Sequence, residues 1–437
     1  MHLCTVSRVK LEFRLATLVL ESIERKRISF DKAYNRTLRK KFEKKEGFLY
    51  NVYELAWNSI LKSYLADYIY SEVFKGRKLN IRRQCALRVA FYLVAYNRMN
   101  PETLAMYSGG LIKKELLSFL RMVYREDVEG IVADLPFDRK LSILNSYPLT
   151  LINSLSRFMK KRELEKFVKS QNRKTMWLRV NTVKIDVDKA IRSLEKEGVY
   201  VSQDKDYPYL LKITQCRKIV GNIRLVKDFR VIPMDKASAV VVDVLSPSRG
   251  ELILDATAAP GIKSSLILQL TEDKARVIAV DLSRNRLYQM HKIINKLGVK
   301  NIDILLSDAR KVKIRNVDKV LIDAPCSNSG AIRRDPALRL ILKSKPKLYE
   351  HVASQRSILD NIVNNIRFRI GVYATCSVIP EEGEKQMARL SDILNIVKVK
   401  SIGLEGYRGY LNYDKFSRLF PHTHDTDGFF IAKFKGR

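Results

Sequence analysis

The second half of the chain alternates short apolar stretches with amphipathic segments, and this alternation limits the folds open to it. Apolar spacing typical of helices occurs in SSLILQL and RNRLYQMHKIINKLG. Strand-like stretches lie around them: ELILDAT (251–257), RVIAVDLS (276–283), IDILLSDA (302–309), DKVLIDAP (318–325) and FRIGVYAT (368–375). Apolar strands that alternate with amphipathic helices predict a doubly wound α/β domain from residue 231 to 437, with a mostly parallel sheet covered on both faces.

The first half of the chain shows two other sequence patterns. In LRVAFYLVAY (87–96) and LIKKELLSFLRMVYR (111–125) apolar residues recur every three or four positions, which predicts helices. From Thr175, the stretches TMWLRVNTV, VYVSQ, YLLKIT and NIRLVKD predict strands around a helix that Asp186 opens and Gly198 closes. We therefore expect an all-α domain at residues 1–140, and a linker helix with a small α+β subdomain at 141–230.

The charge balance indicates a polyanionic partner. The chain has 81 lysines and arginines against 47 acidic residues, a net charge of +34. A thermophilic surface would pair its bases with acids more evenly, so nucleic acid is the better explanation. No apolar stretch approaches the roughly 18 residues of a membrane span. The charged N-terminus is unlike a signal peptide, and an odd number of cysteines favours a reducing compartment. We expect a cytoplasmic protein that does not bind membranes.

Acidic residues end four consecutive predicted strands: Asp255, Asp281, Asp308 and Asp323. Ligands of doubly wound folds bind beyond the carboxyl ends of the strands, where a carboxylate can hold a ribose diol. Asp281 follows Gly261 by 20 residues, as such a carboxylate should. The motif G-x-G-x-x-G is absent, so an adenosine ligand smaller than a dinucleotide fits better, although other doubly wound folds share this spacing.

Two of the five cysteines, Cys326 and Cys376, end apolar strands just before tight turns. A thiolate is a strong nucleophile, and a turn beside basic residues favours its formation. Zinc is a weak alternative because the thiols are 50 residues apart and outside any C-x-x-C motif; His422 and His424 are more typical of a surface loop. We expect no metal, and a disulfide switch remains an alternative.

Thiols, carboxylates and an adenosine site in a basic protein fit one chemistry. The C5 atom of a pyrimidine is too poor a nucleophile to take a methyl group directly. A thiolate that adds at C6 makes C5 an enamine carbon, which can attack an electrophilic methyl group. A base must then remove the C5 proton so that the thiol leaves.

Three motifs resemble the signatures of the RNA cytosine-C5 methyltransferases, the Sun/NSUN group: DATAAPGIKS, LIDAPCSNSG and YATCSVIPEEGE. The stretches MWLRVNT, VIPMDKAS, IRRDPALR and PHTHDTDGFFIAKF follow in the order of that family. LRVAFYLVAYNRMNPETLAMYSGGL is similar to the NusB-like domain of the Sun-type rRNA methylases. The resemblance implies a Rossmann-like class I methyltransferase domain preceded by an all-α NusB-like domain and a small RNA-binding α+β subdomain.

The resemblance also implies roles for individual residues. Cys376 would be the nucleophile at C6, Cys326 would assist product release, and Asp323 would hold the polar edge of the cytosine. Lys263 would favour the thiolate. S-adenosyl-L-methionine would be held at its ribose by Asp281, at its adenine by Asp308, and elsewhere by Asp323 and by Thr257, Ala258, Ala259, Pro260, Gly261, Ile262 and Lys263.

The chain departs from the family pattern at four positions. Thr257 and Ile262 stand where the family has cysteine and a second glycine, and a side chain at position 262 could narrow the cofactor loop. Asn328 replaces a glycine, and Gly383 replaces an asparagine. Both thiols and all the carboxylates are kept, so we expect an active enzyme.

Two other functions are alternatives to this one. A catalytically silent RNA-binding or ribosome-assembly factor would keep the scaffold without the chemistry. A DNA cytosine methylase is disfavoured because those enzymes take the nucleophile from the Pro-Cys motif. Ribosomal RNA is the substrate favoured by analogy, with tRNA as the second option, and we expect a monomer. The sequence does not identify the target cytosine.

Overall fold

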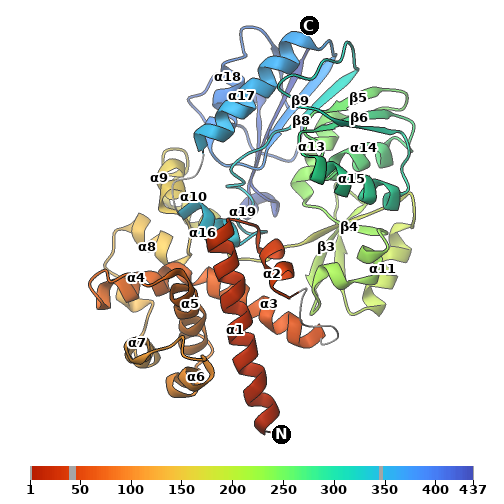
Figure 1. Ribbon diagram of the computed structural model, residues 1–437. Coiled ribbons are helices and arrows are strands. Elements are labelled where there is room, and N and C mark those ends of the chain that lie inside the picture. Colours follow the sequence, from red (N-terminus) through yellow and green to blue (C-terminus); the bar gives the residue numbers. More distant parts are fainter. Residues whose placement is uncertain (1, 39–45, 344–347, 437) are drawn as a thin grey trace. The chain divides into compact units, whose positions relative to one another are not determined.

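The computed structural model describes residues 2–38, 46–343 and 348–436 and divides the chain into two compact units (Figure 1). The helical unit comprises Met1–Arg173 and Asp335–Pro346. The α/β unit comprises Lys174–Arg334 and Lys347–Arg437. The expected domain boundaries at residues 140 and 230 stay a prediction. No helix in the described part of the chain is long and apolar enough to cross a membrane.

The helical unit contains no strand among its described residues. Its long first helix packs against the second, third and fifth helices. The predicted helices at 87–96 and 111–125 correspond to α5 and α7. The α-helices of this unit are α1 (His2–Lys26), α2 (Phe30–Leu38), α3 (Glu46–Leu61), α4 (Ser63–Val73), α5 (Ile81–Ala95), α6 (Pro101–Tyr107), α7 (Lys114–Arg125), α8 (Phe137–Leu144), α9 (Leu149–Leu155), α10 (Lys161–Ser170) and α16 (Ala337–Lys343).

The helix α16 joins this unit although it comes from the second half of the chain. Its Arg339 is fully buried and donates a hydrogen bond of 2.7 Å to the carbonyl oxygen of Gln171, just after α10. The hydroxyl of Tyr64 donates to the carbonyl oxygen of Arg339 at 2.5 Å. A buried guanidinium that satisfies backbone carbonyls thus holds this short segment among the N-terminal helices.

The α/β unit begins with a small antiparallel sheet in the order β2-β3-β1-β4. Asp186 caps the helix that covers this sheet, accepting hydrogen bonds from the backbone N–H groups of Asp188 and Lys189, as predicted. The elements are β1 (Trp177–Val180), α11 (Val187–Lys196), β2 (Tyr200–Gln203), β3 (Leu210–Gln215), α12 (Arg224–Lys227) and β4 (Val231–Pro233).

The prediction of a strand at NIRLVKD was wrong. These residues form the helical turn α12, closed by a hydrogen bond of 2.9 Å from the N–H of Asp228 to the carbonyl oxygen of Arg224. Leu225 is buried in the core of the small sheet and Val226 packs against it. Two adjacent apolar residues fit a helical turn that lies on a core better than the strict alternation of an exposed strand.

The large sheet has the order β10-β12-β9-β8-β5-β6-β7, with β11 paired to β12. Strands β5 to β9 are parallel and lie within the five predicted stretches, so that prediction is confirmed. The C-terminal strands add an antiparallel part that the apolar pattern did not predict. The strands are β5 (Leu252–Asp255), β6 (Arg276–Asp281), β7 (Ile302–Leu306), β8 (Lys319–Asp323), β9 (Ile370–Thr375), β10 (Asn395–Val397), β11 (Ser417–Leu419) and β12 (Phe429–Lys435).

Successive residues of the central strands bury their side chains on opposite faces of this sheet. Ile253 and Leu321 pack in the cluster formed with α13 (Lys236–Leu245), α14 (Ile262–Leu270) and α15 (Arg284–Leu297). Leu254 and Val320 pack in the cluster formed with α17 (Leu348–Asn365) and α18 (Glu384–Ala388). Helices cover both faces of the large sheet (Figure 1), and the carboxyl ends of its parallel strands meet at one edge.

Candidate active site

The two predicted thiols meet at this carboxyl edge. Strands β8 and β9 are parallel neighbours with Asp323 opposite Ala374, so the turns that follow them lie side by side. The Sγ atoms of Cys326 and Cys376 are 3.1 Å apart. Cys326 is buried, whereas Cys376 is half-buried. The structure therefore offers one thiol that is accessible and one that lies directly behind it.

Asn328 connects the pair. Its Oδ1 atom accepts a hydrogen bond of 2.8 Å from the thiol of Cys376 and lies 4.0 Å from the Sγ atom of Cys326. The residue has φ of 57°, in the left-handed region that asparagine tolerates better than other non-glycine residues. The replacement of glycine by asparagine at this position therefore causes no distortion and adds an acceptor for the thiols.

The pKa of the Cys326 thiol is raised well above its usual value. The hydrogen bond with Cys376 is the largest cause, followed by burial and by the negative charge of Glu382. Each of these disfavours the thiolate of Cys326. Cys326 is therefore held as the protonated thiol at neutral pH.

Glu382 holds the turn that carries Cys326. Its fully buried carboxylate accepts hydrogen bonds from the N–H of Ser327 at 2.8 Å and from its hydroxyl at 2.6 Å. The side chain of Gln355, on α17, donates to the same carboxylate at 3.1 Å and to the carbonyl oxygen of Pro325 at 2.9 Å. These positioning roles were not predicted; the acidic run after Cys376 was the only signal for Glu382, and nothing near Gln355 indicated its role.

Two glycines bring the C-terminal strand against the thiol turns. The N–H of Gly330 donates to the carbonyl oxygen of Cys376 at 3.0 Å, and the N–H of Gly428 donates to the carbonyl oxygen of Gly330 at 2.8 Å. A Cβ atom on Gly330 would lie 1.9 Å from the carbonyl oxygen of Gly428. Glycine is required here because the two backbones touch.

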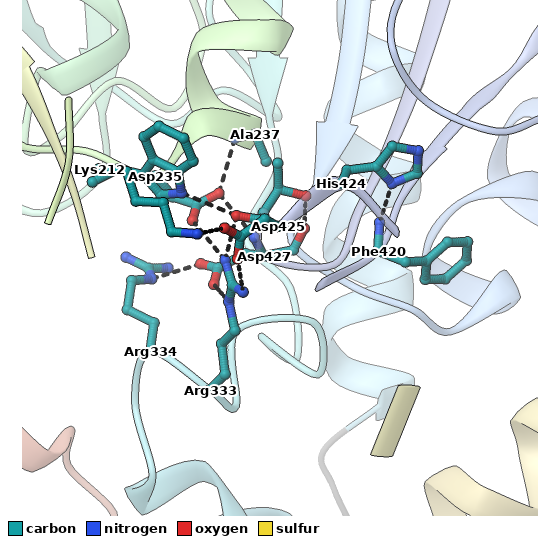
Figure 2. Close-up of polar contacts among 11 residues, drawn as sticks. Lys212, Asp235, Ala237, Arg333, Arg334, Phe420, His424, Asp425 and Asp427 are labelled. Carbon is teal, nitrogen blue, oxygen red and sulfur yellow. Dashed lines mark hydrogen bonds and ion pairs between the residues drawn. The ribbon is translucent and has the colours of Figure 1, made fainter. Parts of the chain in front are cut away.

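A buried charge cluster anchors the same loop a few residues later (Figure 2). Arg333 donates to the Oδ1 atom of Asp425 at 2.9 Å and to its carbonyl oxygen at 2.7 Å. Arg334 donates to the Oδ2 atom of Asp427 at 2.7 Å, and the N–H of Asp427 donates to Asp235 at 2.9 Å. Burial, followed by the charge of Asp427, raises the pKa of Asp235 to about 7.

His424, near this cluster, has a local structural role. The Nδ1 atom of His424 accepts a hydrogen bond of 2.9 Å from the N–H of Phe420 (Figure 2), and burial lowers the pKa of His424. No group of histidines, cysteines and carboxylates in the described part of the chain has the arrangement of a metal site.

The loop between β5 and α14 has the backbone expected of a cofactor loop. Gly261 has φ of 95°, and a Cβ atom there would lie 3.0 Å from the Cγ atom of Met290. The N–H of Ala259 donates to the carboxylate of Asp281 at 3.3 Å. The loop is therefore held against the end of β6, next to the carboxylate predicted to bind ribose.

The two predicted adenosine carboxylates lie in successive turns. The N–H of Ser307 donates to the carbonyl oxygen of Asp281 at 3.3 Å, which places Asp308 in the next turn. Asp281 is buried and pairs with Arg286 at 3.2 Å. The pKa of Asp308 is lowered by its hydrogen bonds with Arg310. Two carboxylates and the backbone of the loop fit an adenosine-bearing cofactor.

Asp323 and Lys263 form a pair at the end of β8. The Nζ atom of Lys263 lies 2.5 Å from the Oδ2 atom of Asp323, and its ammonium lies 5.7 Å from the ring centre of Phe429. The hydroxyl of Thr257 donates to the carbonyl oxygen of Asp323 at 2.9 Å. The described hydrogen bonds of Lys263 do not include a thiol, so its expected effect on the thiolate stays a prediction.

Ile262 packs against the hydrophobic cluster below the loop. Its carbonyl oxygen accepts a hydrogen bond of 2.9 Å from Arg179, which also donates to the hydroxyl of Ser265 at 2.9 Å. Arg179 lies on β1 and is almost fully buried, and this burial lowers its pKa to about 9. The stretch MWLRVNT was part of the family resemblance, but nothing in the sequence predicted that its arginine would support the first turn of α14.

Asp255 supports α14 from the strand side. Its Oδ2 atom accepts a hydrogen bond of 2.6 Å from the hydroxyl of Ser264, while its Oδ1 atom has no partner among the described residues. Burial raises the pKa of this carboxyl to about 6.

The fold and the site together define a class of protein. A doubly wound, mostly parallel sheet with an antiparallel strand beside β9 is typical of the class I methyltransferases that use S-adenosylmethionine. Residues 242–435 match the family described as 16S rRNA methyltransferase RsmB/F, and residues 147–219 match the RsmF/B-like ferredoxin-like domain. These two segments of the chain thus match domains of the RsmB/F, or Sun-type, methyltransferase family, in agreement with the predicted resemblance.

Curated relatives agree with this family. A tRNA (cytosine(72)-C(5))-methyltransferase of Pyrococcus horikoshii is 36% identical over 219 residues, which cover 46% of this chain and 51% of the relative. Ribosomal RNA small subunit methyltransferase B of Proteus mirabilis is 29% identical over 282 residues, covering 61% of each chain. The chain therefore spans about half to three fifths of the length of these relatives.

Solved structures share the fold. The crystal structure of PH0851 has a TM-score of 0.79 at 24% identity and covers 97% of this chain and 98% of the other. The structure of NSun6 from Pyrococcus horikoshii with SFG has a TM-score of 0.58 at 24% identity, with 67% and 99% covered. At this identity the likeness describes the fold alone.

Proposed function

We propose that this protein is an S-adenosylmethionine-dependent RNA cytosine-C5 methyltransferase in which Cys376 attacks the base and Cys326 completes the reaction. The observation that carries the proposal is the distance of 3.1 Å between one half-buried and one buried thiol beyond adjacent parallel strands. The names of the two curated relatives, one acting on tRNA and one on ribosomal RNA, support the same chemistry.

The two thiols have different roles in the reaction. The Sγ atom of Cys376 bonds to C6 of the cytosine, and C5 becomes nucleophilic. The cofactor supplies an electrophilic methyl group. The thiol of Cys326 gives its proton to solvent, and the resulting thiolate takes the proton from C5. The C6–Sγ bond then breaks, and Cys376 leaves as thiolate while the aromatic ring is restored.

The surroundings of Cys326 are consistent with this order of steps. Its hydrogen bond with Cys376 is the largest cause of its raised pKa, and that bond is lost when the Sγ atom of Cys376 bonds to carbon. Loss of that bond removes the largest of these causes, whereas burial and the charge of Glu382 still favour the protonated thiol. Before that step Cys326 stays protonated and does not compete for the substrate.

The remaining predicted residues are assigned to binding. We assign the ribose of the cofactor to Asp281, its adenine to Asp308, and its methionine part to residues 257–263. Asp323, held by Lys263, would accept hydrogen bonds from the cytosine edge. The fold neighbour with SFG, an S-adenosylmethionine analogue, supports this choice of cofactor.

The substrate is proposed to be a structured RNA, with ribosomal RNA favoured and tRNA as the second option. The net charge of +34 provides the attraction to phosphates. We also propose that the protein is a monomer. A location in the cytoplasm is proposed because two free thiols at this distance need a reducing compartment to stay reduced.

The experiment that tests the proposal is covalent trapping. Cys326→Ala is mixed with S-adenosylmethionine and total cellular RNA, and a denaturant-stable protein–RNA adduct should accumulate because release is impaired while Cys376 still attacks. Sequencing of the trapped RNA identifies the substrate. Cys326→Ala/Cys376→Ala should form no adduct, and Cys216→Ala, which changes a thiol of the small subdomain, should turn over without accumulating one.

An adduct that persists in the double variant would overturn the assignment of Cys376. Absence of an adduct from Cys326→Ala, with in vitro-transcribed small-subunit rRNA and tRNA as well as total RNA, would overturn the proposed chemistry.

A further inference from the structure

A second concave surface lies at the opposite edge of the large sheet. Its cavity has a volume of about 650 Å³. Lys319 and Ile370 begin β8 and β9, and Lys435 ends the antiparallel strand β12, opposite Ile370. This cavity is therefore formed by the amino ends of the parallel strands, whereas the thiols lie beyond their carboxyl ends.

The charged side chains that line the cavity are mostly cationic. Lys319, Arg369, Lys433 and Lys435 contribute four positive charges, and Glu251 is the one carboxylate in the lining. Glu251 pairs with Lys319 at 2.9 Å and with Arg369 at 2.7 Å, so its single charge is shared between two cations.

Lys433 and Lys435 have no ion pair with a carboxylate among the described residues. The ammonium of Lys433 donates a hydrogen bond of 2.8 Å to the carbonyl oxygen of Val244, and this bond does not neutralise it. Burial, followed by the nearby charge of Lys319, lowers the pKa of Lys433, while Asp243 acts in the opposite direction. Lys435 is exposed at the rim.

The other acidic groups near the cavity are already engaged. Asp318 lies 3.7 Å from Arg369 and accepts a hydrogen bond of 2.8 Å from the N–H of Leu252. Asp243 accepts a hydrogen bond of 3.2 Å from the hydroxyl of Tyr207. Like charges gathered in a concave surface attract an anion, because the low-dielectric walls focus their field.

We propose that this amino-edge cavity is a second nucleic-acid contact, in which Lys433 and Lys435 bind phosphates of the RNA backbone at a distance from the catalytic edge. The nature of the ligand rests on the proposed function, since an RNA whose cytosine enters the thiol site can continue around the α/β unit. Neither the catalytic motifs nor the family matches assign these lysines a role.

The test measures RNA affinity against salt concentration for the full chain with Lys433→Gln and Lys435→Gln combined. Each lysine that neutralises a phosphate adds about one to the slope of log K against log salt, so the double variant should lose about two. Lys292→Gln with Lys313→Gln is the matched control, because it removes the same charge outside the cavity lining. Lys435→Gln alone, an exposed change that cannot disturb the core, should lose about one.

A slope in the double variant that equals that of the control pair would overturn the proposal. Stabilisation of the wild type by inorganic phosphate that the double variant loses, with an unchanged RNA slope, would assign the cavity to a free anion instead of RNA. The readout needs RNA binding but no methyl transfer, so it is separate from the trapping experiment. If trapping fails while the slope changes, the cavity stands and the proposed chemistry does not.

Discussion

The side chain of Arg179, on β1, donates a hydrogen bond of 2.9 Å to the carbonyl oxygen of Ile262, the first residue of α14. This bond joins the small antiparallel sheet to the loop assigned to the cofactor. The guanidinium is almost fully buried, and its hydrogen-bond partners among the described residues are a carbonyl, a hydroxyl and a thioether, none of them an acid. A cation placed in the core without an acid is costly, which suggests that the position of the loop depends on it.

Arg179→Met should weaken cofactor binding and destabilise the protein. The hydroxyl of Ser265 would lose its donor, and the carbonyl oxygen of Ile262 would keep only the bond from that hydroxyl, at a cost of about 1–3 kcal/mol, partly offset by removal of a buried charge. Calorimetry with S-adenosylmethionine and urea unfolding measure the two effects. Arg276→Met, on the exposed side of β6, is the control and should change stability by no more than about 0.5 kcal/mol. Unchanged cofactor affinity in Arg179→Met would show that the loop does not need this support.

Glu382→Gln should slow methylation more than it weakens cofactor binding. The amide offers one acceptor where the carboxylate serves Ser327 and Gln355 together, so the turn that carries Cys326 would lose a hydrogen bond at a buried site. We expect a loss of about 1–3 kcal/mol in stability and at least about a tenfold fall in turnover. Glu381→Gln is a close control, because Glu381 is the preceding residue and its carboxylate pairs with Lys385 near the surface. Equal turnover in the two variants would remove Glu382 from the positioning of the thiol turn.

The contribution of Asp235 to the stability of the protein should fall as the pH rises from 4 to 7. Its pKa in the folded state, about 7, exceeds the ordinary value of 3.8, so the folded protein binds the proton more tightly than the unfolded chain. Stability from this group is complete below the unfolded pKa and is lost as the pH rises through about 7, on the order of 4 kcal/mol in all.

Asp235→Asn tests this dependence, because the amide can still accept at the start of α13 but does not titrate. Urea unfolding at several pH values should give a shallower decline for the variant than for the wild type. Asp255, whose pKa is raised to about 6 by burial, changes stability in the same direction and remains in both proteins. Parallel curves for the two proteins would contradict the raised pKa of Asp235.

Ile262→Gly restores the residue usual in the family and should leave cofactor affinity within about threefold. The wild-type side chain packs into the core below the loop, so its removal opens a cavity and adds a flexible residue to α14. The expected loss of stability is about 2–4 kcal/mol. Thermal unfolding with and without S-adenosylmethionine separates the two effects. A tenfold gain in affinity would mean that Ile262 narrows the loop.

The sequence by itself determined the central sheet and the meeting of the two thiols. Strands β5 to β9 are apolar on both faces because helices cover both, and that pattern is local. Once those strands are parallel neighbours, Cys326 and Cys376 must lie at one edge. The single turn α12 was missed because the apolar residues Ile223, Leu225 and Val226, with one arginine after the first, are compatible with a strand as well as with a helical turn.

Only the tertiary structure decided which residues support the site. Arg179 acts 83 residues from Ile262 in the chain, and Gln355 acts 27 residues from Glu382. The same holds for the division of the chain, since Arg339 places α16 in the helical unit through a carbonyl 168 residues away. Periodicity reports which side of a strand or helix is buried. The partner of a buried polar group is chosen by packing between distant segments, and no local pattern in the chain records that choice.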